Sequence, residues 1–186
     1  MKRTNRFNAF MLYGIFLTLY ILLFFYALIF KYISPLDLFS SDREYVRSIN
    51  VIPFHTIYSY LSGSLNVSPV IVVSNILGNI ILFVPLGLYL QLLKKTKKIW
   101  ISILIIFFTP LFVEMFQFIF GLGAADIDDI ILNCSGGLIG ILVYRWLYAF
   151  LKNEEKVRTA IVLSGFIIIL IPVLITVMFG FGFRLG

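Results

Sequence analysis

Five long apolar stretches dominate the pattern of hydrophobic and polar positions along the chain. They run over residues 9–30, 69–93, 100–120, 130–150 and 160–183. Each has about the length of a helix that crosses the hydrocarbon core of a bilayer, roughly 20 residues. None alternates apolar and polar residues as the strands of a membrane β-barrel would. The pattern therefore predicts an all-α polytopic membrane protein with about five transmembrane helices.

The composition agrees with this pattern and excludes a water-soluble globule. Of the 186 residues, 61% are hydrophobic and 13% are charged, and the mean hydropathy is +1.03. A soluble domain typically has about 45–50% apolar and about 25% charged residues. The five stretches leave space only for connecting segments, so any chemistry belongs to the membrane bundle or its loops.

The basic residues predict the orientation of the chain. Eleven of the fifteen Lys and Arg residues lie at the N-terminus, in the connection 94–98 and in the segment 145–158. Because cytoplasmic segments are enriched in Lys and Arg, we expect the N-terminus in the cytoplasm and the C-terminus outside. The basic residues then mark a membrane side, and no nucleic-acid partner is expected.

This topology divides the chain into three regions. Residues 1–30 form an N-terminal span, residues 31–150 a central membrane domain with an outer loop at 31–68, and residues 151–186 a C-terminal span. The outer loop contains a second apolar patch, 49–61, that is too short to cross a bilayer. We expect that patch to form an interfacial or partly re-entrant helix on the outer leaflet.

Polar side chains gather in the three central spans and in the short turn at residues 121–129. Within each span they are three or four residues apart, a spacing that places them on one helix face. By position, those of the spans lie in the outer half of the bilayer, where polar groups usually face the bundle interior. The aspartates of the turn are expected outside, near water. Together these polar side chains predict an outward-facing polar pocket with these binding residues: Asn75, Asn79, Glu114, Gln117, Asp126, Asp128, Asp129 and Asn133.

Structural roles are open for several of these residues. Asparagines and glycines on helix faces often serve packing, as Gly136-x-x-x-Gly140 would, and Asp126 could cap the helix that follows it. Glu114 is a functional-site hypothesis by default, because ionisable side chains at that depth are rare. The acids and His55 could ligate a metal, but their spacing matches no zinc motif, so we expect no metal and no other cofactor. The single cysteine, Cys134, is expected to be a packing residue.

Five short blocks, in this order, resemble the VanZ-like family. They are Asn50–Phe54, Asn75–Gly87, Glu114-x-x-Gln117, Asp126–Asp129 and Asn133-x-x-Gly136-Gly137, and the matching region runs from about Asn50 to Arg145. Members of this family usually carry an arginine shortly before the aspartates, where Gly123 and Ala124 stand here. Arg43 or Arg47 of the outer loop could supply that cation instead.

The resemblance implies a multi-pass protein of the bacterial cell membrane. The family takes its name from an accessory protein associated with resistance to teicoplanin, a glycopeptide antibiotic with a lipid tail. The first hypothesis is non-enzymatic: the pocket binds membrane lipids, a lipid-linked cell-wall precursor or a lipid-tailed glycopeptide, and contributes to glycopeptide resistance or envelope homeostasis.

Two alternatives remain open beside the binding hypothesis. One is a membrane-embedded enzyme that acts on a lipid or envelope glycan head group, with Glu114 as general acid or base and Asp128 or Asp129 as its partner. The other is a structural subunit of an envelope complex. No catalytic residue is assigned, and the sequence favours the non-enzymatic reading.

Overall fold

The computed structural model describes residues 14–15, 17–26, 47–64, 67–93 and 99–165. The chain divides into two compact units, one formed by Leu22–Arg145 and the other by Met1–Ile21 together with Trp146–Gly186. The predicted first and fifth spans lie only in part among the described residues. Within them, Leu17–Tyr26 is a short apolar helix and residues 154–165 are helical. Five spans and the orientation of the termini therefore stay predictions.

Among the described residues, three helices are long and apolar enough to cross a membrane: α3 (Pro69–Leu93), α4 (Ile99–Phe120) and α5 (Ile127–Leu151). They confirm three of the predicted spans and an all-α membrane protein. The predicted third span began one residue late, at Trp100, and the fourth began three residues late, at 130. The fourth differs because the first turn of α5 contains Asp128 and Asp129, which a hydropathy pattern excludes but a helix N-terminus favours.

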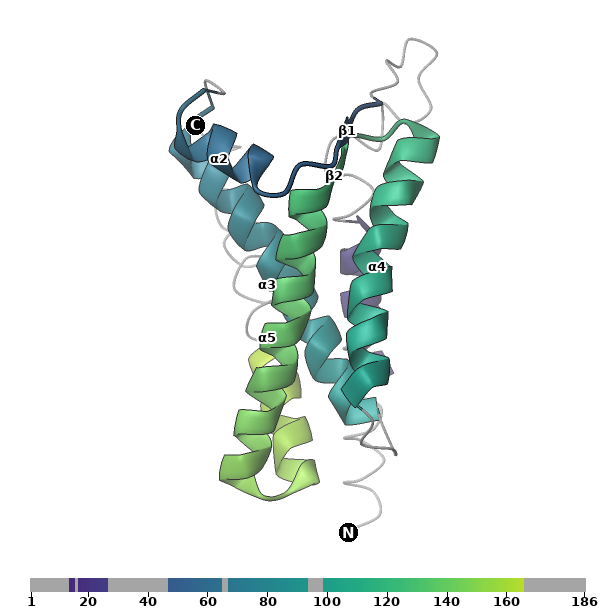
Figure 1. The fold of residues 1–186 in the computed structure, drawn as a ribbon. Coiled ribbons are helices and arrows are strands. Elements are labelled where there is room, and N and C mark those ends of the chain that lie inside the picture. The colour runs from purple at the N-terminus through teal and green to yellow at the C-terminus, as the bar shows by residue number, and fades with distance from the viewer. Residues whose placement is uncertain (1–13, 16, 27–46, 65–66, 94–98, 166–186) are drawn as a thin grey trace, which may run out of the picture. The chain divides into compact units, whose positions relative to one another are not determined.

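The backbones of α3 and α5 touch where the two helices cross (Figure 1). A Cβ atom on Gly87 would lie 2.0 Å from the carbonyl oxygen of Gly137, and one on Gly136 would lie 2.0 Å from that of Ile80. A Cβ on Gly140 would likewise meet the carbonyl oxygen of Val84 at 2.1 Å. Small residues therefore permit this approach, as they do in other membrane helix pairs.

Helix α4 packs on α5 through side chains. Ile106 is 1% exposed, and its side chain fills the space above Gly137. The thiol of Cys134 donates a weak hydrogen bond, 3.6 Å long, to the carbonyl oxygen of Ile106. Cys134 thus lies in this contact between the two helices.

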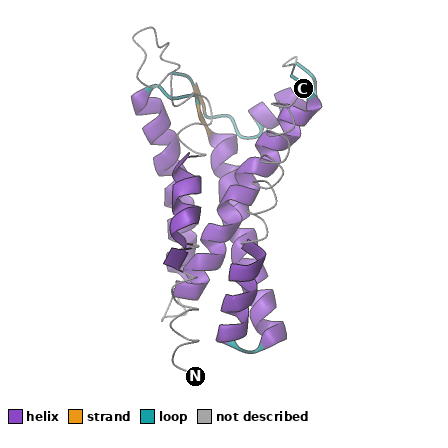
Figure 2. Cartoon of the chain, turned by 180° about the vertical axis from the view of Figure 1, so that it is seen from behind, coloured by secondary structure: helices purple, strands orange, loops and turns teal. Residues whose placement is uncertain are grey.

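The remaining elements lie at one end of the three helices (Figures 1 and 2). The strands β1 (Ile49–Asn50) and β2 (Ala125–Asp126) pair in parallel, with Ile49 opposite Ala125 and Asn50 opposite Asp126. Helix α2 (His55–Leu61) follows β1. The predicted apolar patch at 49–61 is therefore a strand, a turn and a seven-residue helix, because Phe54 adopts a left-handed conformation with φ 63° before the helix starts.

Candidate functional site

The predicted site residues are mostly buried, although three of them, Asp126, Asp128 and Asp129, precede or begin α5 at the end of the bundle. Exposure is 8% or less for all of them except Asn75, which is half-buried. The aspartates of the turn were expected near water, but the elements β1 and α2 cover them. The buried members are Asn79, Glu114, Gln117, Asp126, Asp128, Asp129 and Asn133.

Asp126 joins the start of α5 to the segment around β1. Its Oδ1 accepts hydrogen bonds from Asn50 Nδ2 at 3.0 Å and from the backbone N–H of Asp128 at 2.9 Å. Its Oδ2 accepts a hydrogen bond from the hydroxyl of Thr56 at 2.5 Å. The bond to Asp128 is the expected N-cap of α5, so Asp126 both caps its own helix and binds a distant segment.

Asp128 caps a different helix, α2. Its Oδ1 accepts a hydrogen bond from the backbone N–H of Phe54, and its Oδ2 accepts one from that of Ile57 at 3.1 Å. A helix start leaves its first four N–H groups without intrahelical partners. The N-cap residue of α2, Phe54, makes no side-chain cap bond. Asp128, which belongs to α5, therefore provides the capping carboxylate that the N-cap residue of α2 does not provide.

A chain of amide side chains links α2, α3 and α5. Asn79 Nδ2 donates hydrogen bonds to Asp129 Oδ1 and, at 3.1 Å, to Asn75 Oδ1. Asn75 Nδ2 in turn donates to the hydroxyl of Tyr60 on α2, at 3.4 Å. Asn75 and Asn79 thus lie on one face of α3, as their spacing predicts. Through them α3 is hydrogen-bonded to Tyr60 of α2 and to Asp129 of α5.

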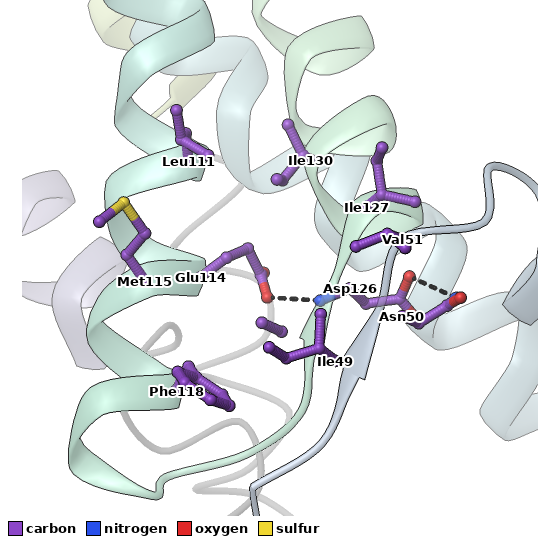
Figure 3. A pocket seen from close by; sticks show the side chains of 11 residues that line it. Ile49, Asn50, Val51, Leu111, Glu114, Met115, Phe118, Asp126, Ile127 and Ile130 are labelled. Carbon is purple, nitrogen blue, oxygen red and sulfur yellow. Dashed lines mark hydrogen bonds between the residues drawn. The ribbon is translucent and has the colours of Figure 1, made fainter.

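Glu114 lies on the other side of the aspartates, in the wall of a hollow of about 310 Å³. Its Oε2 accepts a hydrogen bond of 3.0 Å from the backbone N–H of Asp126 (Figure 3). The polar side chains in the wall are those of Glu114, Asp126 and Asn50. The apolar lining comes from β1, α4 and the start of α5, through Ile49, Val51, Leu111, Met115, Phe118, Ala125, Ile127 and Ile130.

The structure separates the predicted residues into groups. Glu114 and Asp126 line the hollow, whereas Asp129 is hydrogen-bonded to Asn79 and is not part of its wall. Gln117 follows Glu114 on α4 and is 2% exposed. Asn133 follows Asp129 on α5 and is 1% exposed, and its Oδ1 has no hydrogen-bond partner among the described residues.

Arg47 is the described basic residue nearest the position of the family arginine. Its Nη2 donates a hydrogen bond of 3.3 Å to the carbonyl oxygen of Ile119, in the last turn of α4. A cation at this position interacts favourably with the helix dipole. Arg43 lies outside the described residues.

Three further residues belong to the cluster and were missing from the predicted site: Asn50, Thr56 and Tyr60. Asn50 Nδ2 donates to Thr56 Oγ1 at 2.9 Å as well as to Asp126. Asn50 is the first residue of the block Asn50–Phe54 that resembles the family. That resemblance could have identified it as a member of the predicted site. Thr56 and Tyr60 carry no such signal, because their contacts depend on how α2 folds back over the bundle.

The carboxyl groups do not form a recognisable metal site. Among the described residues, no group of three or more His, Cys, Asp or Glu side chains is arranged to hold a metal ion. His55 is exposed at the start of α2.

These features define a polytopic membrane protein with a buried cluster of carboxyl and amide side chains at one end of its helices. The chain belongs to the VanZ/LLP1 family, whose sequence profile matches residues 16–152. It is similar to Protein VanZ of Enterococcus faecium, with 29% identity over 119 residues that cover 62% of this chain and 73% of that protein. No solved structure matches the chain. The family resemblance seen in the sequence is thereby confirmed.

Proposed function

We propose that this VanZ-like protein binds an amphiphile in the hollow beside Glu114 and thereby contributes to glycopeptide (teicoplanin) resistance or to envelope homeostasis. The ligand would be a membrane lipid, a lipid-linked cell-wall precursor or a lipid-tailed glycopeptide. The observation that supports this is the lining of the hollow, where apolar side chains surround the carboxyl groups of Glu114 and Asp126. Mostly apolar walls with a few placed polar groups are typical of small-molecule sites.

The proposal places the hollow at the outer face of a bacterial cell membrane. The supporting evidence is the distribution of charge along the spans. Arg145 near the end of α5, together with Lys152 and Lys156 beyond it, lies at the opposite end of α5 from Asp128. Because basic residues mark the cytoplasmic side, the end that carries the aspartates faces outward.

The test measures teicoplanin susceptibility in a sensitive bacterial host that expresses the chain. Wild-type protein should lower susceptibility to teicoplanin more than to a glycopeptide without a lipid tail. Glu114→Gln should lose this effect at matched membrane levels, because the amide keeps the shape of the side chain and still accepts the N–H of Asp126 but removes the charge. Glu154→Gln, the same change at an exposed position, is the matched control and should behave as wild type.

Two results would contradict the proposal. If the wild-type chain leaves teicoplanin susceptibility unchanged, the antibiotic role is wrong. If Glu114→Gln protects as well as wild type does, Glu114 has a structural role only and the hollow is not the site of action.

The second candidate function is a membrane-embedded enzyme acting on a lipid or envelope glycan head group. The observation that favours it is the presence of two carboxyl side chains, Glu114 and Asp126, in the wall of one hollow. General acid–base chemistry requires such groups within hydrogen-bond reach of the substrate. Turnover of a radiolabelled envelope lipid by purified protein, abolished by Glu114→Gln, would support an enzyme over a binding protein.

A further inference from the structure

We infer that the hollow beside Glu114 holds a hydrocarbon chain of the bound amphiphile, which enters sideways from the outer leaflet, while the head group stays outside the hollow. This inference rests on the proposed function, because it states which part of the ligand the same site takes. Three observations carry it: the apolar surface of the hollow, the hydrogen bonds among the polar groups of its wall, and the exposed apolar residues at its rim.

The surface that the hollow presents to a ligand is almost entirely apolar. Its side chains come from several elements, with Ile49 on β1, Leu111 and Phe118 on α4, and Ile130 on α5. Leu111 and Phe118 lie on either side of Glu114 along α4, and Ile130 stands opposite (Figure 3). A polar head group placed here would lose its water without gaining equivalent hydrogen bonds, which is unfavourable. A hydrocarbon chain has no such hydrogen bonds to lose.

The polar groups of the wall are engaged with one another. Glu114 Oε2 accepts a hydrogen bond from the backbone N–H of Asp126. The carboxylate of Asp126 accepts hydrogen bonds from Asn50 and Thr56, and the amide of Asn50 also donates to Thr56. These bonds hold β1, α4 and the start of α5 together. The polar atoms of the wall therefore serve the fold, and the apolar side chains form the surface that a ligand meets.

Exposed apolar residues form the rim of the hollow. Ile49, Val51 and Met115 line it and are each more than half exposed. Phe112 and Ile119 continue this exposed apolar surface along α4, a helix long and apolar enough to cross a membrane. Since the exposed face of such a helix meets lipid, a chain in the outer leaflet reaches the hollow without crossing water.

The size of the hollow limits how much of an amphiphile it takes. Its volume of about 310 Å³ is at the lower end of the range for ligand pockets, about 300–1,000 Å³. Lipid tails are as apolar as leucine side chains, so a chain gains no hydrophobic free energy by leaving the bilayer. Its binding depends on close packing against the lining side chains. The hollow thus holds one segment of a chain, and the remainder stays in the leaflet.

Photolabelling from within the bilayer tests the inference. The probe is a phosphatidylcholine with a diazirine halfway along one acyl chain, mixed into nanodiscs that hold the full chain, and mass spectrometry locates the label after illumination. Glu114 lines the hollow, whereas Asp128 and Asp129 are similarly buried carboxyl groups that do not line it. Glu114 should be labelled, and the two aspartates should not. Label on the exposed Phe112 without label on Glu114 would overturn the inference.

Two tryptophan variants locate the chain. Ile130→Trp should fill the hollow and remove the label from Glu114. Ile119→Trp is the matched control, at an exposed position of α4 that does not line the hollow, and should keep the label. Retained label in Ile130→Trp would place the chain elsewhere and overturn the inference. If Ile130→Trp fails to fold, the comparison of Glu114 with Phe112 in the wild-type protein decides the question.

Competition identifies the amphiphile that supplies the chain and separates this inference from the proposed function. Excess teicoplanin should lower the labelling of Glu114, whereas a glycopeptide without a lipid tail should not. Labelling of Glu114 that teicoplanin leaves unchanged would support the inference with a membrane lipid as ligand and would contradict the antibiotic role. Protection against teicoplanin without any labelling of Glu114 would overturn the inference alone.

Discussion

The carboxylate of Asp128 accepts a hydrogen bond from the backbone N–H of Phe54, a residue 74 positions earlier in the chain. Together with its bond to the N–H of Ile57, this contact gives α2 a cap from another helix. The cap also fixes where α2 lies, because a carboxylate that is 1% exposed on the first turn of α5 has little freedom to follow a moving partner. Asp128 therefore determines both the start of α2 and its place over the bundle.

Removal of this cap should release α2. We expect Asp128→Ala to destabilise the protein by about 1–2 kcal/mol, in the range measured for lost N-caps, and to speed amide hydrogen exchange in residues 54–61. Hydrogen-exchange mass spectrometry in nanodiscs would measure this. Glu154→Ala removes an exposed carboxylate and should change neither quantity. Unchanged exchange in Asp128→Ala would show that packing alone holds α2.

The hydrogen bond between Asn79 and Asp129 should contribute measurably to the association of α3 with α5. Asn79→Ala leaves the Asp129 carboxylate without this donor, so the midpoint of thermal unfolding in detergent should fall, by an amount equivalent to about 1–3 kcal/mol. Asp129→Ala should have a similar effect. The double variant should be less destabilised than the sum of the two single variants, because both remove the same bond. Strict additivity would indicate that the two side chains do not interact.

Two glycines on α3 offer a matched pair for testing the helix crossing. A methyl group on Gly87 would meet the backbone of α5 at 2.0 Å, whereas one on Gly78 has nothing within 4 Å. Gly87→Ala should therefore lower the amount of folded protein in the membrane severely. Gly78→Ala should leave it unchanged or raise it, since alanine is the better helix former. Immunoblots of isolated membranes with a size-exclusion trace for each variant would measure this, and equal yields would contradict the observed crossing.

Topology can be tested with single cysteines in a Cys134→Ala background. Ser64 follows α2 and Glu154 follows α5, and both are exposed. Ser64→Cys should react with an impermeant maleimide in intact cells, because the aspartate end of the helices is expected to face outward. Glu154→Cys should react only after lysis. Labelling of Glu154→Cys in intact cells would reverse the orientation and with it the proposed access to the hollow.

The sequence predicts the three described long helices well, because hydrophobic length is a local property. Pro69–Leu93 agrees at both ends, and the late start assigned to α5 arose from the two aspartates in its first turn. The one-face placement of Asn75 and Asn79 also follows from helical spacing alone.

The contacts between distant segments could not be predicted in the same way. The pairing of Asn50 with Asp126 in β1 and β2, and the cap that Asp128 gives to α2, join residues more than 70 positions apart. No local pattern of polarity encodes which backbone amides such a carboxylate will meet. For that reason the sequence placed the aspartates near water, whereas the folded chain buries them.

The direct backbone contact where α3 crosses α5 has a mechanical consequence. Where Gly87, Gly136 and Gly140 bring two backbones into direct contact, there are no rotamers through which one helix could slide over the other. These two helices must then move together as one rigid body in any conformational change of the protein. Helix α4 rests on that body through the side chain of Ile106, which can repack. Any widening of the hollow that admits a ligand must therefore come from a shift of α4 or of the β1–α2 segment.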